Sequence, residues 1–303
     1  MSISCVIVTK NRPESVQRLL NSIAAQDEAP LEIILVNDGG ESSPYSSGDI
    51  PLVVIENKDS VGSGRARNLG VEHSQSPLIL LLDDDVELIG SDFISQGLKA
   101  MSTPKTGLAF PRKIDVIGHR SFELSFFAEN QWTGELRKIP QNKMDNKNEG
   151  RGEVEGIRAP LLGPMVTFIR RHAFEEVGGY DSIFGWGRGH SFREESDFQL
   201  RVQRKGWGAA ILKDSFFKHH IQVMGGHGPH LFKKLFWIGH NQVVFGSRHQ
   251  KNWLRKAVFF AGLELPRYSW GNGRLLTSPA GLLGWSAGLA TSLIKGSTSR
   301  QKR

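Results

Sequence analysis

Three consecutive acidic residues, Asp83, Asp84 and Asp85, follow the apolar run Leu78–Leu82 and are the first candidates for chemistry. In an extended segment, Asp83 and Asp85 point to one side and Asp84 points to the other. Two carboxylates on one side repel each other unless a cation or a basic group lies between them. Carboxylate oxygens bind hard divalent ions such as Mg²⁺ and Mn²⁺, which commonly bridge to the phosphates of a substrate. The triplet therefore favours a metal and phosphate site over the alternative, an acidic turn that caps a helix.

The surrounding residues predict an α/β fold that would position this triplet. Four short runs rich in Val, Ile and Leu have the pattern of parallel strands buried on both faces; they are Ile3–Val8, Leu31–Val36, Leu52–Ile55 and Leu78–Leu82. Residues 13–25 carry apolar side chains at helical spacing, and a glycine-rich loop leads into a second predicted helix over 64–73. Strands that alternate with helices indicate a doubly wound, parallel sheet, in which ligands bind at the carboxyl ends of the strands.

Polar residues follow each predicted strand, where that sheet would bind its ligand. They are Thr9, Asn11 and Arg12 after the first strand, Asp38 after the second and Asn57 after the third. Gly64 opens the helix behind the glycine-rich loop, whose free N–H groups suit an anion, and Arg67 lies on this helix, where it could also be an ordinary exposed charge. Neither a GxGxxG nor a GxxxxGK[ST] motif follows these strands, which excludes the dinucleotide and P-loop signatures.

Six segments of the chain, taken in order, resemble family 2 of the glycosyltransferases, enzymes of the GT-A fold. The segments are Ser4–Arg12, Ile34–Gly39, Gly64–Gly70, Leu81–Val86, Arg170–Asp181 and Glu194–Arg201. The resemblance implies a Rossmann-like, mostly parallel sheet flanked by helices. Residues 1–110 would bind the nucleotide sugar, and residues 111–230 of the same domain would bind the acceptor and carry catalysis. Residues 231–303 would form a basic, Trp-rich helical tail.

The resemblance also implies roles on the donor side. Asp38 would hold the base or ribose of the nucleotide, and Arg67 would approach its diphosphate. The other donor-binding candidates are Thr9, Asn11, Arg12, Asn57, Gly64, Asp83 and Asp84.

A divalent metal, Mn²⁺ or Mg²⁺, is the cofactor that the resemblance implies. Asp85 would be its main ligand within a DxD motif, and Asp83 would face both the metal and the ribose. A histidine after a later strand would complete the shell, and the spacing favours His219 with His220 as the alternative. Neighbouring residues on a strand point to opposite faces, so one of the two can be the ligand.

Inverting glycosyl transfer needs a base that takes the proton of the acceptor hydroxyl, and a carboxylate can serve. In the family this base is the aspartate of a Glu-Asp pair that opens a helix, so Glu195 takes the base position here, with Glu194 and Asp197 as alternatives. The helix dipole alone would also favour acids at the start of the predicted helix 194–205. Upstream, Trp186 and Gly187 resemble the Gly-Trp-Gly loop of some galactosyltransferases, which implies contact with the acceptor sugar; Trp186 could instead be a core aromatic.

The net charge of +7 is unevenly distributed along the 303 residues. Residues 231–303 contain 12 Lys and Arg and one acid, so they carry +11, whereas residues 1–230 contain 26 basic and 30 acidic residues and carry −4. Four of the seven tryptophans also lie in this tail: Trp237, Trp253, Trp270 and Trp285. Basic and aromatic residues suit the surface of an anionic bilayer. The alternative is that the tail helices pack on the catalytic part and keep their charges solvated.

The remaining features bear on compartment and on other partners. The single cysteine, Cys5, excludes a disulfide framework and favours a reducing compartment. The N-terminus lacks a targeting signal, and the longest uncharged stretch, 275–294, is too diluted by polar residues for a spanning helix. No nucleic-acid reader motif accompanies the basic tail. We therefore expect a cytoplasmic protein, peripheral on the inner face of the cell membrane, without a nucleic-acid partner.

Together these features predict a metal-dependent inverting glycosyltransferase. It would move a sugar from a nucleoside-diphosphate sugar to a hydroxyl of a glycan or lipid-linked acceptor, in cell-surface polysaccharide or glycolipid synthesis. The alternative is an inactive GT-A domain that binds sugar nucleotides or acts as a scaffold, which the Glu-Glu pair and the loop 188–193 before it would favour. The sequence leaves the nucleotide, the sugar and the acceptor open.

Overall fold

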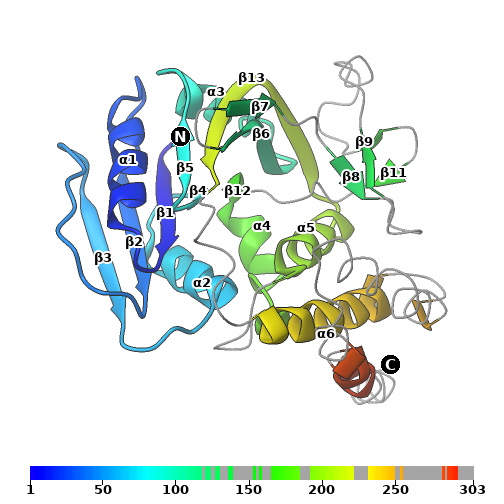
Figure 1. The fold of residues 1–303 in the computed structure, drawn as a ribbon. Coiled ribbons are helices and arrows are strands. Elements are labelled where there is room, and N and C mark those ends of the chain that lie inside the picture. The colour runs from blue at the N-terminus through cyan, green and yellow to red at the C-terminus, as the bar shows by residue number, and fades with distance from the viewer. Residues whose placement is uncertain are drawn as a thin grey trace.

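One mixed nine-stranded sheet forms the centre of the computed structural model (Figure 1). The structure describes residues 1–117, 120–123, 127–129, 136–138, 153–154, 157–158, 165–184, 192–221, 231–249, 253–254, 282–283 and 285–292. The strands of the sheet are β1 (Ile3–Thr9), β2 (Glu32–Asp38), β3 (Leu52–Asn57), β4 (Leu78–Asp83), β5 (Val86–Leu88), β6 (Thr106–Ile117), β7 (Arg120–Glu123), β12 (Val166–Arg170) and β13 (Gly208–His220). Two small strand pairs lie apart from it: β8 (Phe127–Glu129) with β9 (Leu136–Lys138), and β10 (Glu153–Val154) with β11 (Ile157–Arg158).

The parallel half of the sheet confirms the α/β fold predicted from the apolar runs. Its order is β3-β2-β1-β4, and all three pairings are parallel. The register pairs Val8 with Asp83, Thr9 with Asn37 and Asp38 with Asn57. The polar residues that end these strands therefore lie along one edge of the sheet, as parallel strands require.

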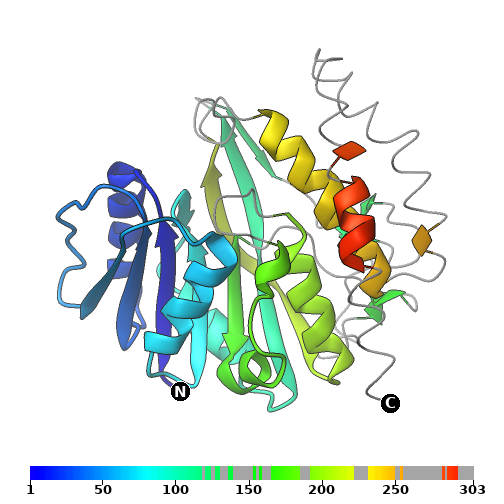
Figure 2. The ribbon, with the colours of Figure 1, turned by 90° about the horizontal axis from the view of Figure 1, so that it is seen from below.

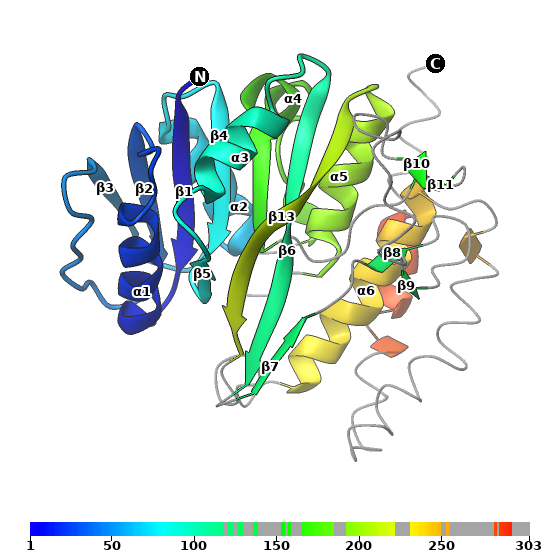
Figure 3. The same ribbon diagram turned by 90° about the horizontal axis from the view of Figure 1, so that it is seen from above.

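Helices cover both faces of the sheet, because alternate residues of each strand point to opposite sides. The helices are α1 (Pro13–Ala24), α2 (Ser63–His73), α3 (Phe93–Ala100), α4 (Arg171–Glu176), α5 (Glu194–Arg204) and α6 (Leu231–His249), with a short 3-10 helix, η3 (Ser182–Phe184). Cys5 and Ile7 of β1 pack with α1 and α3, whereas Val6 packs with α2, α4 and α5. Figure 2 shows the α2, α4 and α5 layer in front of the sheet, and Figure 3 shows α1 and α3 in front of it.

Strand β3 differs from the expectation that all four early strands are buried on both faces. It is the edge strand, and its Val53 and Val54 are 44% and 40% exposed. An edge strand has one neighbour instead of two, so an apolar run there need not be covered by helices. The strand forms as predicted, but the expected burial of both of its faces is not observed.

The second half of the chain extends the same sheet. Strand β6 spans residue 110, where the sequence analysis places the boundary between the donor-binding and acceptor-binding parts of the domain. Strand β12 runs antiparallel between β4 and β6, β13 is parallel to β6, and β5 is antiparallel to β13. Strand β13 has an irregularity in its pairing with β6 between Ile211 and Phe216. At its end, His219 pairs with Val86 of β5, directly after the acid triplet.

Helix α6, the first part of the expected tail, packs on η3 and α5. Val244 and Phe245 of α6 form a buried cluster with Ile183, Phe184 and Leu200. Residues 285–292 are helical and lie against α6, where Gly288 is so close that a Cβ would be 2.6 Å from the carbonyl oxygen of His240. Figures 1 and 2 show α6 beside α5, on the side away from the sheet, and the 285–292 helix against α6. For these residues the packing alternative of the sequence analysis holds.

Among the described residues, no helix has the length and the apolar character needed to cross a membrane.

Gly70 sets how closely α2 approaches the sheet, and this distance can be tested. A Cβ at Gly70 would overlap the side chain of Val6 and lie 3.2 Å from that of Val36. We therefore expect Gly70→Ala to reduce the free energy of unfolding by about 1–3 kcal/mol, as overpacking does, in urea denaturation. Gly64→Ala on the same helix is the matched control, since its Cβ would lie 3.4 Å from Tyr180 Cβ. Equal stability of the two variants would contradict the tight contact.

Candidate active site

A buried cation joins three acidic residues from two distant parts of the chain. Arg67, on α2, is 5% exposed. Its Nη2 lies 2.7 Å from Asp83 Oδ1 and 3.0 Å from Glu195 Oε1, and its Nη1 lies 3.4 Å from Glu194 Oε1. Because Asp83 ends β4 and Glu194 begins α5, these ion pairs bring the expected base next to the acid triplet. Arg67 is therefore not the exposed helix charge of the alternative interpretation.

The charges in this cluster do not balance, and the pKa values of its groups shift accordingly. Burial alone would lower the pKa of Arg67, but Asp83 and Glu195 raise it well above its usual value, so the guanidinium stays charged. Burial raises the pKa of Glu195 to about 8, and repulsion from Glu194 and Asp83 adds to the effect of burial although Arg67 opposes it. Burial also raises the pKa of Glu194. A carboxyl with a raised pKa in a polar cluster is typical of a catalytic acid or base.

A sharp turn aims the first residues of α5 at this cluster. Arg193, just before the helix, has a φ of 71°, in the left-handed region that a non-glycine residue rarely adopts. Its Nε donates to Gln242 Oε1 of α6 at 2.9 Å, and its guanidinium lies 5.1 Å from the ring centre of Phe245. Contacts with α6 therefore stabilise the turn that presents Glu194 and Glu195.

The other two acids of the triplet are held by the last residue of β1 and by the turn that follows it. Thr9 Oγ1 donates to Asp84 Oδ2 at 2.7 Å, and Arg12 Nη1 lies 2.8 Å from Asp84 Oδ1 and 3.0 Å from Asp85 Oδ2. Burial raises the pKa of Asp84 to about 6 against the opposing effect of Arg12. Burial and the charge of Asp83 likewise raise the pKa of Asp85. Thr9 and Arg12 thus meet the triplet as their place after the strand predicts.

Asp38 organises the glycine-rich loop with both of its carboxylate oxygens. It accepts hydrogen bonds from Asn57 Nδ2 at 3.0 Å, from Ser60 Oγ at 2.7 Å, and from the backbone N–H groups of Val61 and Gly62 at 2.8 and 3.0 Å. Burial alone would raise the pKa of Asp38, but these hydrogen bonds lower it. Asp38 and Asn57 therefore shape the loop before α2. Asn11, with a φ of 56°, accepts the Glu41 N–H at 2.8 Å and ties the β1 turn to the segment after β2.

The histidines at the end of β13 point to different partners, as their neighbouring positions predict. His219 Nε2 lies 3.8 Å from Asp85 Oδ2, whereas His220 Nε2 lies 2.7 Å from Glu87 Oε2. Of the two, His219 therefore faces the acid triplet. Asp83 is turned to Arg67, and no group of three His, Cys, Asp or Glu side chains that could hold a metal is found in the described part of the chain.

A divalent metal nevertheless fits the donor set at Asp85 and His219. Mg²⁺ and Mn²⁺ are commonly held by one or two protein ligands, while phosphates and water supply the rest. One carboxylate oxygen and one imidazole nitrogen are ligands that Mn²⁺ accepts, and a separation of 3.8 Å between them is compatible with one ion. Both residues would then act together with the diphosphate of a donor.

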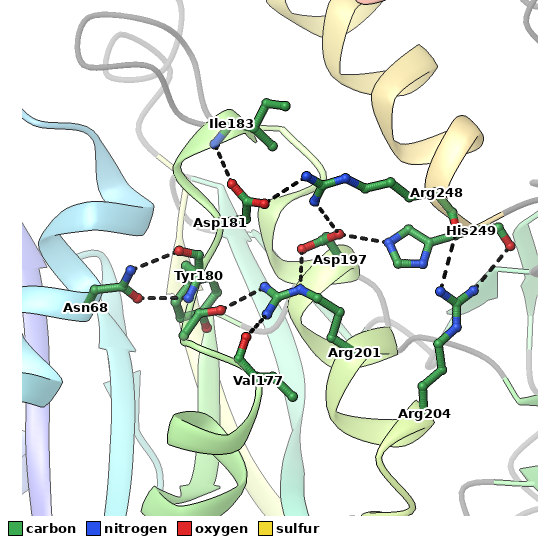
Figure 4. Close-up of polar contacts among 11 residues, drawn as sticks. Asn68, Val177, Tyr180, Asp181, Ile183, Asp197, Arg201, Arg204, Arg248 and His249 are labelled. Atoms are coloured by element: carbon green, nitrogen blue, oxygen red, sulfur yellow. Dashed lines mark hydrogen bonds and ion pairs between the residues drawn. The ribbon is translucent and has the colours of Figure 1, made fainter. Parts of the chain in front are cut away.

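Asp197 is enclosed in a separate ion cluster between α5 and α6 (Figure 4). Its carboxylate lies 2.7 Å from Arg201 Nε, 2.8 Å from His249 Nε2 and 3.3 Å from Arg248 Nη1, and the residue is 0% exposed. Burial alone would raise the pKa of Asp197, but His249 and Arg201 hold it below its ordinary value. The structure thus gives Asp197 an anchoring role, and Glu194 and Glu195 remain as candidate bases.

Trp186 and Gly187, the expected contacts of the acceptor sugar, lie outside the described residues. The residues on either side of this segment are tied to α6, because the fully buried Asn241 donates from Nδ2 to the carbonyl oxygens of Phe184 at 2.8 Å and Phe192 at 3.0 Å.

Two residues of the site escaped the sequence analysis. Asn68 of α2 exchanges hydrogen bonds with the backbone of Tyr180 at 2.8 and 2.9 Å, which ties the helix of Arg67 to the segment before η3 (Figure 4). Asp115 of β6 lies 2.7 Å from His219 Nδ1. Asn68 stands within the Gly64–Gly70 segment, which could have drawn attention to it, whereas a lone acid on a strand carries no such signal.

Acids at the carboxyl edge of the parallel half of the sheet, a glycine-rich loop that leads into a helix and a facing carboxylate pair form the arrangement that the resemblance to GT-A enzymes implies. The model of the family described as glycosyl transferase family 2 matches residues 4–178, more than half of the chain. The chain belongs to this family.

Individual relatives agree with the family assignment. The chain is 42% identical over 100 residues to the uncharacterized glycosyltransferase YwdF of Bacillus subtilis, a match that covers 32% of this chain and 35% of that protein. It is 26% identical to a glucosyl-dolichyl phosphate glucuronosyltransferase of Haloferax volcanii, over 80% of this chain and 77% of that protein. The matches span less than half the length of the first curated relatives.

A solved structure shares the fold over nearly the whole chain. The mannosyltransferase PcManGT of Pyrobaculum calidifontis, in complex with GDP-Man and Mn²⁺, superposes with a TM-score of 0.55 at 15% identity. The match covers 99% of this chain and 80% of that chain. It confirms the GT-A fold expected from the resemblance.

The raised pKa of Glu195 predicts a pH-dependent stability. In the unfolded chain this carboxyl ionises near its ordinary value of 4.5, but in the folded protein it holds its proton up to about pH 8. Between these values the unfolded state is favoured increasingly as pH rises, so the wild type loses stability relative to Glu195→Gln, which cannot ionise. Urea unfolding should show that the free energy of unfolding of Glu195→Gln, relative to that of the wild type, is higher at pH 8 than at pH 5. A stability difference that is the same at both pH values would contradict the buried, protonated state.

Proposed function

We propose that the protein is a metal-dependent inverting glycosyltransferase that uses a nucleoside-diphosphate sugar. The acceptor is a hydroxyl of a glycan or of a lipid-linked glycan, in cell-surface polysaccharide or glycolipid synthesis. Family membership supports the reaction class, and the relative named for glucosyl-dolichyl phosphate supports a lipid-linked acceptor.

One observation carries this proposal: Arg67 bridges Asp83 and Glu195, since its Nη2 lies 2.7 Å from Asp83 Oδ1 and 3.0 Å from Glu195 Oε1. The acid triplet is the donor end of the site, and Glu195 is the proposed base at its acceptor end. The guanidinium of Arg67 holds the donor end and the acceptor end so close together that both can contact one donor and one acceptor at the same time. Direct displacement requires the base and the donor to lie close together, because the acceptor oxygen must attack the anomeric carbon while the bond to the diphosphate breaks.

Asp85 and His219 are the proposed metal ligands. The bound cation would neutralise the charge that develops on the leaving diphosphate. Arg12, which neutralises Asp84 and Asp85 at 2.8 and 3.0 Å, lies at the same end and is the proposed second cation for the phosphates. The glycine-rich loop that Asp38 shapes leads into the N-terminus of α2, whose free N–H groups suit the same anion.

Glu195 is the proposed general base, with Glu194 as its neighbour in the same cluster. Glu195 would accept the proton of the acceptor hydroxyl as the new glycosidic bond forms, and inversion follows because attack occurs opposite the departing nucleoside diphosphate. A pKa near 8 makes the ionised carboxylate a strong proton acceptor once it forms. Trp186 and Gly187, outside the described residues, stay the proposed contacts of the acceptor sugar.

Two variants test the two ends of the site separately. Asp85→Ala should abolish the Mn²⁺-dependent stabilisation by nucleoside diphosphates in thermal-shift assays with UDP, GDP and dTDP. Glu195→Gln should keep that stabilisation but lower sugar transfer by about 100-fold or more, as loss of a general base does. Glu87→Gln, which removes the charge of the carboxylate that contacts His220, is the control and should leave both unchanged. Undiminished transfer by Glu195→Gln would refute the base, and Mn²⁺-dependent binding by Asp85→Ala would refute the metal ligand.

We further propose that residues after 250 contact an anionic membrane surface. The support is the charge distribution, since nine of the twelve basic residues of 231–303 follow residue 250. Helix α6 is packed on the catalytic part, so the contact is assigned to the segment beyond it. A lipid-linked acceptor would make such docking useful.

Vesicle binding tests this contact with two matched variants. Replacing Arg255, Lys256, Arg267 and Arg274 by Gln should weaken binding to phosphatidylglycerol vesicles strongly, since each cation near an anionic surface contributes about 1 kcal/mol. Replacing four exposed lysines of the catalytic part, Lys10, Lys58, Lys99 and Lys105, is the control with the same change in charge. Sedimentation with vesicles should separate the two variants. Equal binding by both would contradict a docking role of the tail.

A further inference from the structure

We propose that Asp115 is a positioning residue that orients His219 toward the acid triplet. This inference rests on the proposed function, in which His219 and Asp85 hold a divalent metal. The observation that carries it is a chain of three side chains. Asp115 Oδ1 lies 2.7 Å from His219 Nδ1, and His219 Nε2 lies 3.8 Å from Asp85 Oδ2.

The sheet places these three residues side by side. In the parallel pairing of β6 and β13, His219 stands opposite Asp115, and in the antiparallel pairing of β13 and β5, it stands opposite Val86. The N–H of the next residue, His220, donates to the carbonyl oxygen of Asp85 at 2.8 Å. His219 is thus held between the strand that carries Asp115 and the turn that carries Asp85.

The hydrogen bond to Asp115 decides which nitrogen of His219 is available. An imidazole whose Nδ1–H donates to a carboxylate has its lone pair on Nε2, the nitrogen that faces Asp85. A carboxylate partner also fixes the plane of the ring and makes the other nitrogen a better ligand. Lys113 lies two residues earlier on β6. Its Nζ is 3.2 Å from Asp115 Oδ1 and balances the charge of that carboxylate.

The neighbouring histidine provides a contrast within the same strand. His220 makes an equally short pair, 2.7 Å, but through Nε2 and with Glu87. In that pair the carboxylate contacts Nε2, whereas in His219 the carboxylate contacts Nδ1 and Nε2 faces Asp85, so the two histidine–carboxylate pairs are equally short and differ in direction. Glu87 is therefore a matched control for Asp115.

Binding of Mn²⁺ alone to the full chain, followed by electron paramagnetic resonance of the free ion, tests the proposal without turnover. Asp115→Ala should weaken Mn²⁺ binding by about 10–100-fold, the loss expected when the partner of a metal-binding histidine is removed. Asp115→Asn keeps an acceptor oxygen without the charge, so the loss of Mn²⁺ affinity in this variant should be smaller but at least about threefold. Glu87→Gln should bind Mn²⁺ like the wild type.

The outcomes separate this proposal from the one on which it depends. Wild-type Mn²⁺ binding that His219→Ala does not weaken would overturn the metal site and the positioning role with it. Binding that requires His219 but is unchanged in both Asp115 variants would overturn the positioning role alone. Circular dichroism checks the fold of each variant, and if Asp115→Ala is unfolded, Asp115→Asn decides the question.

Discussion

Arg67 is a buried cation, and a buried cation must be matched by carboxylates that are themselves held in place. Its partners come from the end of β4 and the start of α5, which are more than one hundred residues apart in the chain. The carboxyl edge of the sheet and the first turn of α5 are therefore one electrostatic unit. Burial raises the pKa of Glu195, and because three carboxylates share one guanidinium, the charges of Glu194 and Asp83 raise it further. The same cluster thus holds the site together and determines the acidity of the proposed base.

Helix α6 is the second constraint on the site, although it lies beyond the region that the family model matches. Its Gln242 holds the turn before Glu194, its Asn241 holds Phe192, and its Arg248 and His249 surround Asp197. Four contacts of one helix therefore act on the first turn of α5. A buried acid with three basic partners is stable where it is and costly to rearrange, which suits an anchor better than a proton acceptor. The basic character of the tail begins with this structural helix.

Much of this fold and part of this site could be predicted from local patterns. The apolar runs predicted β1, β2 and β4 because a buried parallel strand needs an unbroken apolar segment, and the polar residues after them were expected at one edge. The exposure of β3 was not predictable, since an edge strand and a central strand can have the same composition. Asp197 and Glu195 are both acids in the first turn of one helix, and local pattern cannot show that one faces α6 and the other Arg67.

The sequence by itself determined the fold class, the family and the residues that carry the charge: the acid triplet, the Glu194-Glu195 pair and the two histidines. These depend on residue type and order, which folding does not change. Only the tertiary structure decided which of them meet. It turned Glu195 to Arg67 and enclosed Asp197, it gave His219 rather than His220 to Asp85, and it supplied Asp115, which no motif marks. The physical reason is that pairing and burial of charge depend on distances between strands and helices that lie far apart in the chain.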